Sequence, residues 1–141
     1  MLEPGECVED VLPPQYLEAF GKLAAGTPDR SIPLPFEVFQ QAFMQDAGEE
    51  AQRIVHSLLS PEPSGVNQTK NTVAVRDLNV IRGYINGRRD IAMPPGEFAW
   101  CPRFPQRLGE HRFVEIDATH EACFTQPSEV ADAILEASAP G

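Results

Sequence analysis

Leu78-Asn-Val-Ile-Arg-Gly-Tyr-Ile85 is a short apolar run that ends in the turn-like sequence Asn86-Gly-Arg-Arg-Asp90. A second run, Arg112-Phe-Val-Glu-Ile-Asp117, leads into the loop sequence Ala118-Thr-His-Glu121. Each run predicts a strand, the first over Asn79–Ile85 and the second over Arg112–Ile116. More than twenty residues separate them, which suits a crossover between parallel strands and is too long for a hairpin. The sequence therefore predicts an α/β fold.

A helix is expected after the second strand. Pro127 is a favourable first helical residue, and the residues after it follow a helical apolar pattern. The pattern predicts that one face of this helix packs on the sheet, formed by Val130, Ala131, Ile134 and Leu135.

Asp90 and His120 each follow one of the predicted strands. Functional groups in parallel sheets gather just beyond the carboxyl ends of the strands, so these two side chains are expected to meet. An acid and a histidine in this chain order are typical of a nucleophilic triad. The alternative for Asp90 is a solvated turn residue, and Glu115 and Asp117 are rival acids.

Two stretches carry a family resemblance: Tyr84-Ile-Asn-Gly-Arg-Arg-Asp90, and Phe113 to Pro127 with its His-Glu-x-x-x-x-x-Pro sequence. They resemble the end of an α/β-hydrolase, in the esterase and hydroxynitrile-lyase-like branch. Leu34–Asp46 and Leu59–Pro63 resemble the helical cap of that branch. The resemblance implies the C-terminal part of the fold: a helical cap, the last two parallel strands and the final helix. It divides the chain into an entry segment 1–13, a cap-like region 14–77 and a core portion 78–141.

The resemblance also implies a chemistry, which is the hydrolysis of small apolar esters without a cofactor or metal. His120 would be the general base and Asp90 would orient it. Phe36, Phe39, Phe43 and Trp100 would line the substrate pocket. An aromatic stripe at helical spacing is more often ordinary core, so the phenylalanines could serve packing alone.

The cap-like region predicts three short helices with apolar faces. The first runs from Pro14 to Ala24 with Gly26 as its stop, and the second from Pro35 to Gln45. Asp46 and Glu49 have the spacing of a capping box for the third helix. Its apolar face would carry Ala51, Ile54, Val55 and Leu58. A short or broken helix within 96–109 is expected to cover one face of the sheet.

The nucleophile of the family is a serine in Gly-x-Ser-x-Gly, and no such stretch occurs between Met1 and Gly141. Cys123 and Ser64 are the alternative nucleophiles, although a small buried cysteine is the simpler interpretation of Cys123. His56 and His111 are expected to be surface or structural residues. The chain is therefore expected to be inactive alone, as a truncated product or one half of a split enzyme. The alternative is a non-catalytic module that binds a ligand or a partner.

The net charge of −10 argues against nucleic acid and anionic membranes as partners. The three cysteines, Cys7, Cys101 and Cys123, are an odd number without metal-type spacing. Together with the absence of a secretory signal, they favour a cytoplasmic location. Two strands with open edges would leave apolar surface uncovered, so the chain is expected to bind an N-terminal half, to self-associate or to be partly molten.

Overall fold

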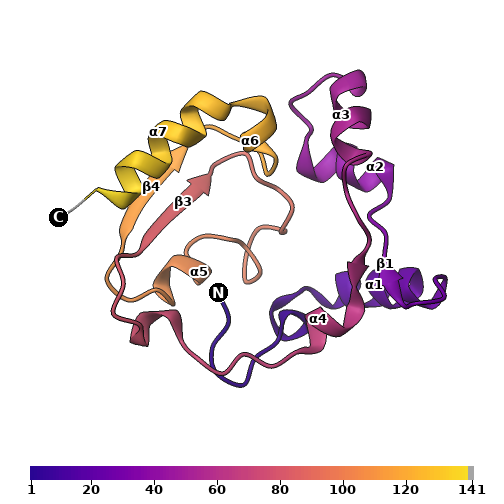
Figure 1. Ribbon diagram of the computed structural model, residues 1–141, viewed down its shortest axis with the longest axis horizontal. Coiled ribbons are helices and arrows are strands. Elements are labelled where there is room, and N and C mark those ends of the chain that lie inside the picture. The colour runs from indigo at the N-terminus through magenta and orange to yellow at the C-terminus, as the bar shows by residue number, and fades with distance from the viewer. Residues whose placement is uncertain (140–141) are drawn as a thin grey trace.

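The computed structural model of the protein describes residues 1–139 (Figure 1). In chain order the helices are α1 (Pro14–Ala25), α2 (Phe36–Val38), α3 (Glu49–His56), α4 (Ser64–Gln68), α5 (Arg103–Gln106), α6 (Ala122–Thr125) and α7 (Pro127–Ser138). The strands are β1 (Ser31–Ile32), β2 (Glu62–Pro63), β3 (Gly83–Gly87) and β4 (Arg112–Ile116). Short 3-10 turns lie at Val8–Val11 and Val75–Asp77. The last two residues of the expected core portion 78–141 lie outside the described range.

β3 and β4 form the parallel pair that the sequence predicted, with Tyr84 opposite Phe113 and Ile85 opposite Val114. The bounds of β4 match the prediction, but β3 begins four residues later than the predicted Asn79. β4 begins at Arg112, opposite Gly83, so residues before Gly83 have no strand beside them. They form an irregular segment, in which the Ile81 side chain is 74% exposed.

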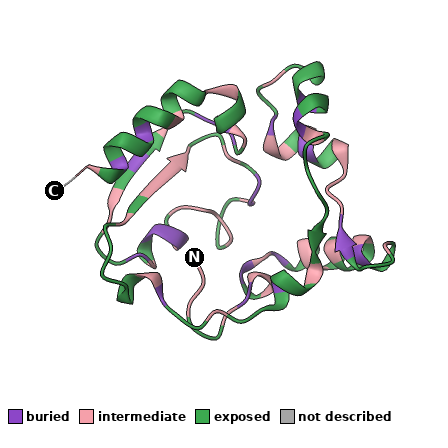
Figure 2. Cartoon of the chain, in the orientation of Figure 1, coloured by how far each residue is buried: buried purple, intermediate pink, exposed green. Residues whose placement is uncertain are grey.

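α7 lies along one face of this strand pair (Figure 1) and begins at Pro127 as expected. The predicted contact face is wrong. Ala133 and Ala137 are buried against Val114, whereas Ile134 and Leu135 are exposed. Most of the surface of α7 is exposed in Figure 2. The physical reason is a close approach: a Cβ atom added to Gly83 would lie 2.8 Å from the Cβ atom of Ala137. Only small side chains fit at this contact.

Helices α1, α2 and α3, within the predicted cap-like region, lie on the right of Figure 1. β1 and β2 pair antiparallel there, Ser31 with Pro63 and Ile32 with Glu62. This pair was not predicted, and it brings together the segments that enter and leave the cap helices. α1, which precedes β1 in the chain, ends before Gly26 as expected.

The predicted helix Pro35–Gln45 changes its hydrogen-bonding pattern partway. α2 passes directly into a π-helix at Phe39–Phe43, in which the N–H of Met44 donates to the carbonyl of Phe39 at 3.1 Å. Phe39 is fully buried and forms the centre of a small core with Met44 and Val55. Because α3 contributes Val55 and Gln52 to the buried side, its predicted apolar face is largely wrong, and Ala51, Ile54 and Leu58 are exposed.

The predicted capping box is also wrong. The residue before α3 is Gly48, and no side chain caps the helix. Asp46 instead directs its carboxylate toward the loop that carries His120, where Thr119 and Thr125 donate to it.

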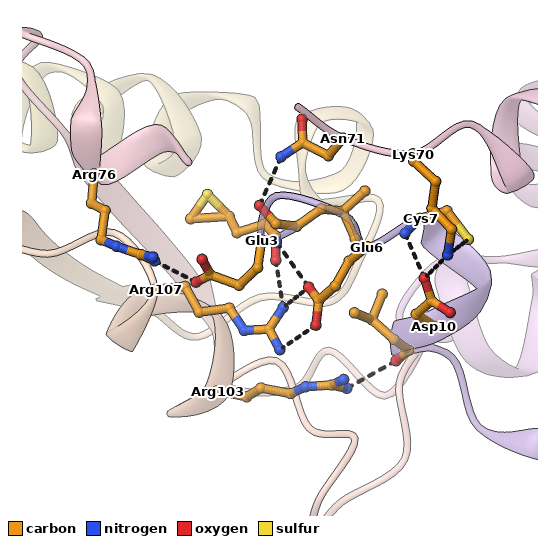
Figure 3. Close-up of polar contacts among 12 residues, drawn as sticks. Glu3, Glu6, Cys7, Asp10, Lys70, Asn71, Arg76, Arg103 and Arg107 are labelled. Carbon is orange, nitrogen blue, oxygen red and sulfur yellow. Dashed lines mark hydrogen bonds and ion pairs between the residues drawn. The ribbon is translucent and has the colours of Figure 1, made fainter. Parts of the chain in front are cut away.

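The entry segment is held to the rest of the chain by polar contacts (Figure 3). Its backbone pairs with Asn71, whose N–H donates to the Glu6 carbonyl at 2.7 Å. Arg107 binds the Glu6 carboxylate at 2.7 Å, and Arg76 binds Glu3. The three arginines labelled in this view, Arg76, Arg103 and Arg107, are all engaged. Within residues 1–139, none of the helices combines the length and apolar character that a membrane crossing needs.

Candidate active site

Asp90 and His120 meet at the carboxyl end of the β3–β4 pair. Asp90 closes the turn after β3, where its N–H donates to the Gly87 carbonyl at 3.1 Å. His120 lies in the loop between β4 and α6. Its Nδ1 is 2.9 Å from Oδ2 of Asp90, and the N–H of Ala92 donates to the other carboxylate oxygen at 2.9 Å. Both carboxylate oxygens are therefore engaged, and Nδ1 of His120 carries the shared proton.

The environment of this pair favours the charged form of each partner. Burial alone would lower the pKa of His120, but the hydrogen bond and charge of Asp90, together with Glu121, outweigh it and raise the pKa above its ordinary value. Burial alone would raise the pKa of Asp90. The hydrogen bonds from His120 and the Ala92 N–H outweigh it, so the pKa of Asp90 is lowered. A histidine tuned in this way can accept a proton and hold it as an imidazolium.

Two aromatic side chains enclose the His120 ring. Phe43 meets it edge-on from the cap, with ring centroids 4.9 Å apart and an interplanar angle of 84°. Trp100 stacks on it at 5.8 Å and 20°. The ring orientation of His120 is thus fixed by packing from two other segments as well as by its bond to Asp90.

The four aromatic residues expected to line a substrate pocket are divided between two places. Phe43 and Trp100 contact His120, whereas Phe36 and Phe39 surround His56, with centroid distances of 5.3 Å and 5.4 Å. His56 is a half-buried cap residue, and its Nε2 is 2.7 Å from the Leu34 carbonyl oxygen. A hollow of about 280 Å³ beside Asp90 is lined by Trp100 and not by the three phenylalanines. Substrate contact by these four residues stays a prediction.

The indole N–H of Trp100 is an unusual feature of the site. It is buried and makes no hydrogen bond of ordinary geometry with the described residues. It nevertheless lies near enough to Asp90 to contribute to the lowered pKa of that carboxyl.

The rival acids are directed away from His120. Glu115 accepts a hydrogen bond from the Asn86 amide at 3.1 Å. Asp117 lies 3.4 Å from Nε of Arg89. The structure therefore brings Asp90 alone of these three acids to the histidine.

The Nε2 atom of His120 makes no hydrogen bond with a described residue. Ser57 and Ser138 donate to carbonyls of their own helices. Ser64 begins α4, within the cap-like region. Cys123 is exposed, contrary to the expectation of a buried cysteine, and it is a free thiol like Cys7 and Cys101.

No group of three or more His, Cys, Asp or Glu side chains in the described part of the chain is arranged to hold a metal ion. The residue that sequence reasoning missed is Asp46, because the pattern around it suggested a helix cap. Its partners Thr119 and Thr125 are 73 and 79 residues away. A contact at that distance leaves no signal in a local pattern.

Among solved structures, the chain is similar to one described as an extracellular α/β-hydrolase from a Paenibacillus species that shares structural and functional homology with tobacco salicylic acid binding protein 2. The TM-score is 0.93 at 25% sequence identity, over 99% of this chain and 59% of that one. No protein-family model and no curated protein matches. The fold is thus that of part of an α/β-hydrolase. The chain spans 59% of the length of the hydrolase it resembles.

Proposed function

We propose that this chain supplies the acid–base part of a serine-esterase site that acts on small apolar esters. The observation that supports this most strongly is the Asp90–His120 hydrogen bond of 2.9 Å at the ends of two parallel strands. In a complete site, Nε2 would take the proton of an attacking hydroxyl and return it to the leaving alcohol. Asp90 would hold the ring tautomer and stabilise the imidazolium.

The nucleophile and the oxyanion donors of such a site would come from outside the described residues. An acid and a base contribute little without them, since each oxyanion donor is worth roughly 3–4 kcal/mol of transition-state stabilisation. The Paenibacillus hydrolase extends well beyond the part that this chain matches. We expect the missing groups to lie in a segment equivalent to that unmatched part.

The test compares the chain alone with the chain supplied with that unmatched part of the Paenibacillus hydrolase, which we expect to carry Gly-x-Ser-x-Gly. Alone, the chain should hydrolyse p-nitrophenyl acetate no faster than His120→Ala. With the added segment, turnover should appear and fall by about 10⁴-fold or more in His120→Ala. His120-dependent turnover by the chain alone would contradict the proposal and would make Cys123 and Ser64 the candidate nucleophiles.

A second candidate is a non-catalytic module that binds a ligand or partner. The observation that favours it is that Nε2 of His120 contacts no nucleophile among residues 1–139. Complementation that forms a stable complex without any His120-dependent turnover would support it. In either case we propose a cytoplasmic location, which the free thiols Cys7, Cys101 and Cys123 favour.

A further inference from the structure

The segment Phe43–Asp46 starts at the last residue of the π-helix. It connects the π-helix to the loops that carry Asp90 and His120. The carbonyl of Phe43 accepts a hydrogen bond from the N–H of Glu121 at 3.1 Å. The side-chain amide of Gln45 donates to the carbonyl of Arg89 at 2.9 Å. One bond therefore reaches the residue after His120, and the other reaches the residue before Asp90.

Asp46 makes the remaining contacts of this segment. Its Oδ1 accepts from the Thr119 hydroxyl at 2.9 Å and its Oδ2 from the Thr125 hydroxyl at 3.2 Å. The Arg89 guanidinium lies 3.8 Å from Oδ2. The Asp46 side chain is 12% exposed although the residue as a whole is exposed, and its hydrogen bonds from the two hydroxyls are charge-assisted.

The segment Phe43–Asp46 holds the residues on either side of His120 in place. Thr119 and Glu121 flank the histidine, and both bind the segment Phe43–Asp46. Arg89 completes the arrangement, because its backbone carbonyl binds Gln45 while its guanidinium donates to the Asp117 carbonyl at 2.9 Å. The two loops are thus joined to each other and to the cap.

We propose that Asp46 is a positioning residue that sets the Asp90–His120 hydrogen bond by holding Thr119, before the histidine, and Thr125, after it. The catalytic meaning of this role depends on the proposed esterase function. The structural claim does not, because the Asp90–His120 bond can be observed without a nucleophile or substrate. The cap is then part of the catalytic geometry, and a displaced cap would disturb it.

The test uses proton NMR of the full chain to follow the low-field resonance of the His120 Nδ1 proton. Its rate of exchange with solvent reports how often the bond to Asp90 opens. Asp46→Ala should raise this rate about tenfold or more, since two charge-assisted hydrogen bonds are lost. Thr119→Val, which removes one donor at constant volume, should raise it by less. Asp46→Asn retains an acceptor for Thr119 and should fall between Asp46→Ala and the unmodified chain.

The matched control is Asp29→Ala. Asp29 also accepts a local hydrogen bond in the cap-like region, from the Ser31 N–H at 3.1 Å, but it has no contact with the His120 loop. It should leave the exchange rate unchanged. Urea unfolding of each variant separates a loss of global stability from local opening. If Asp46→Ala does not fold, the double variant Thr119→Val, Thr125→Val replaces it, because it removes both hydroxyl donors to Asp46. An unchanged exchange rate in that variant would equally overturn the inference.

An exchange rate in folded Asp46→Ala equal to that of the unmodified chain would overturn the inference. So would the absence of a protected Nδ1 proton in the unmodified chain, since there would then be no bond to position. Failure of the proposed function has a different signature. The NMR response would be intact while the complemented chain shows no ester hydrolysis.

Discussion

A methyl group added to Gly83 would collide with Ala137, at 2.8 Å from both the Cβ atom and the carbonyl oxygen of that residue. β3 and α7 therefore pack with no room for a side chain between them. This contact fixes the helix over the strand pair whose far end carries Asp90 and His120.

Gly83→Ala should accordingly lower the free energy of unfolding by about 1–3 kcal/mol, because the collision is with a Cβ atom and a backbone oxygen, neither of which a rotamer change can move. Urea denaturation measures the effect. The matched control is Gly21→Ala in the interior of α1, where an added Cβ atom meets nothing within 4 Å. That change should raise stability by about 0.5–1 kcal/mol. A neutral Gly83→Ala variant would show that the helix can move away.

Asp90→Asn should lower the pKa of His120. The pKa is raised in the native chain only because the charge and hydrogen bond of Asp90 outweigh burial. Without that charge, burial dominates, and the pKa should fall below its ordinary value of 6.5. NMR titration of the imidazole ring measures it. Asp117→Asn is the control, since its carboxylate pairs with Arg89 instead, and it should leave the titration nearly unchanged.

The pair also predicts how stability depends on pH. The pKa of His120 is raised in the folded chain. Its contribution to the free energy of unfolding is therefore complete below pH 6.5, the ordinary pKa, and is lost as the pH rises through the raised pKa of the folded chain. The pKa of Asp90 is lowered in the folded chain. Its contribution to the free energy of unfolding is therefore present above pH 3.8, the ordinary pKa, and is lost as the pH falls through the lowered pKa of the folded chain. The stability difference between the native chain and Asp90→Asn should therefore be largest between these two pH values. Chemical denaturation across pH 3 to 9 checks it, and a difference that does not vary with pH would contradict the pair.

Self-association is expected along the open side of β3. The hydrogen-bond alternation of a parallel pair leaves the backbone groups of Gly83, Ile85 and Gly87 facing away from β4. In the described residues no strand covers them. A hollow of about 500 Å³ lies beside this edge, and Ile81 and Ile134 are among its lining residues.

Ile134→Lys should therefore shift the chain toward monomer in size-exclusion chromatography over a range of concentrations. Ile54→Lys is the matched control, because Ile54 is similarly exposed but lies on the cap helix α3. A native chain that elutes as a compact monomer at all concentrations would refute the expectation. It would also favour a self-sufficient binding module.

Two phenylalanines one helical turn apart should respond differently to truncation. Phe39 is fully buried in the cap core, so Phe39→Ala should cost about 3–5 kcal/mol of stability. Phe43 is half-buried and touches His120, so Phe43→Ala should cost less and should shift the His120 ring resonances. Equal loss of stability with unchanged His120 resonances would assign both residues to packing alone.

The features that could be predicted from the sequence are those that a few neighbouring residues determine. β4 is set by alternating residues, and the start of α7 by Pro127, which has the φ angle that a first turn requires. The carboxyl ends of parallel strands meet at one sheet edge, which is why the approach of Asp90 and His120 could be expected.

The misplaced features depend on partners distant in the chain. Periodicity favoured Ile134 and Leu135 over Ala133 and Ala137 because it weighs apolar size, whereas the contact with Gly83 requires small side chains. The spacing of Asp46 and Glu49 fits a helix cap, but the three-dimensional neighbours Thr119 and Thr125 bind Asp46 more directly. Local patterns carry no information about which residues lie across a loop.

The π-helix at Phe39–Phe43 holds one residue more in its turn than an α-helix would, because the hydrogen bond from Met44 to Phe39 spans five residues and not four. Gln41 is an exposed residue within that turn. Loss of the Gln41 codon would let the turn close as an ordinary α-helical turn, with the same two residues still joined by a hydrogen bond. In a gene drifting under selection, a three-nucleotide gap should therefore be tolerated better at this codon than inside α3 or α7.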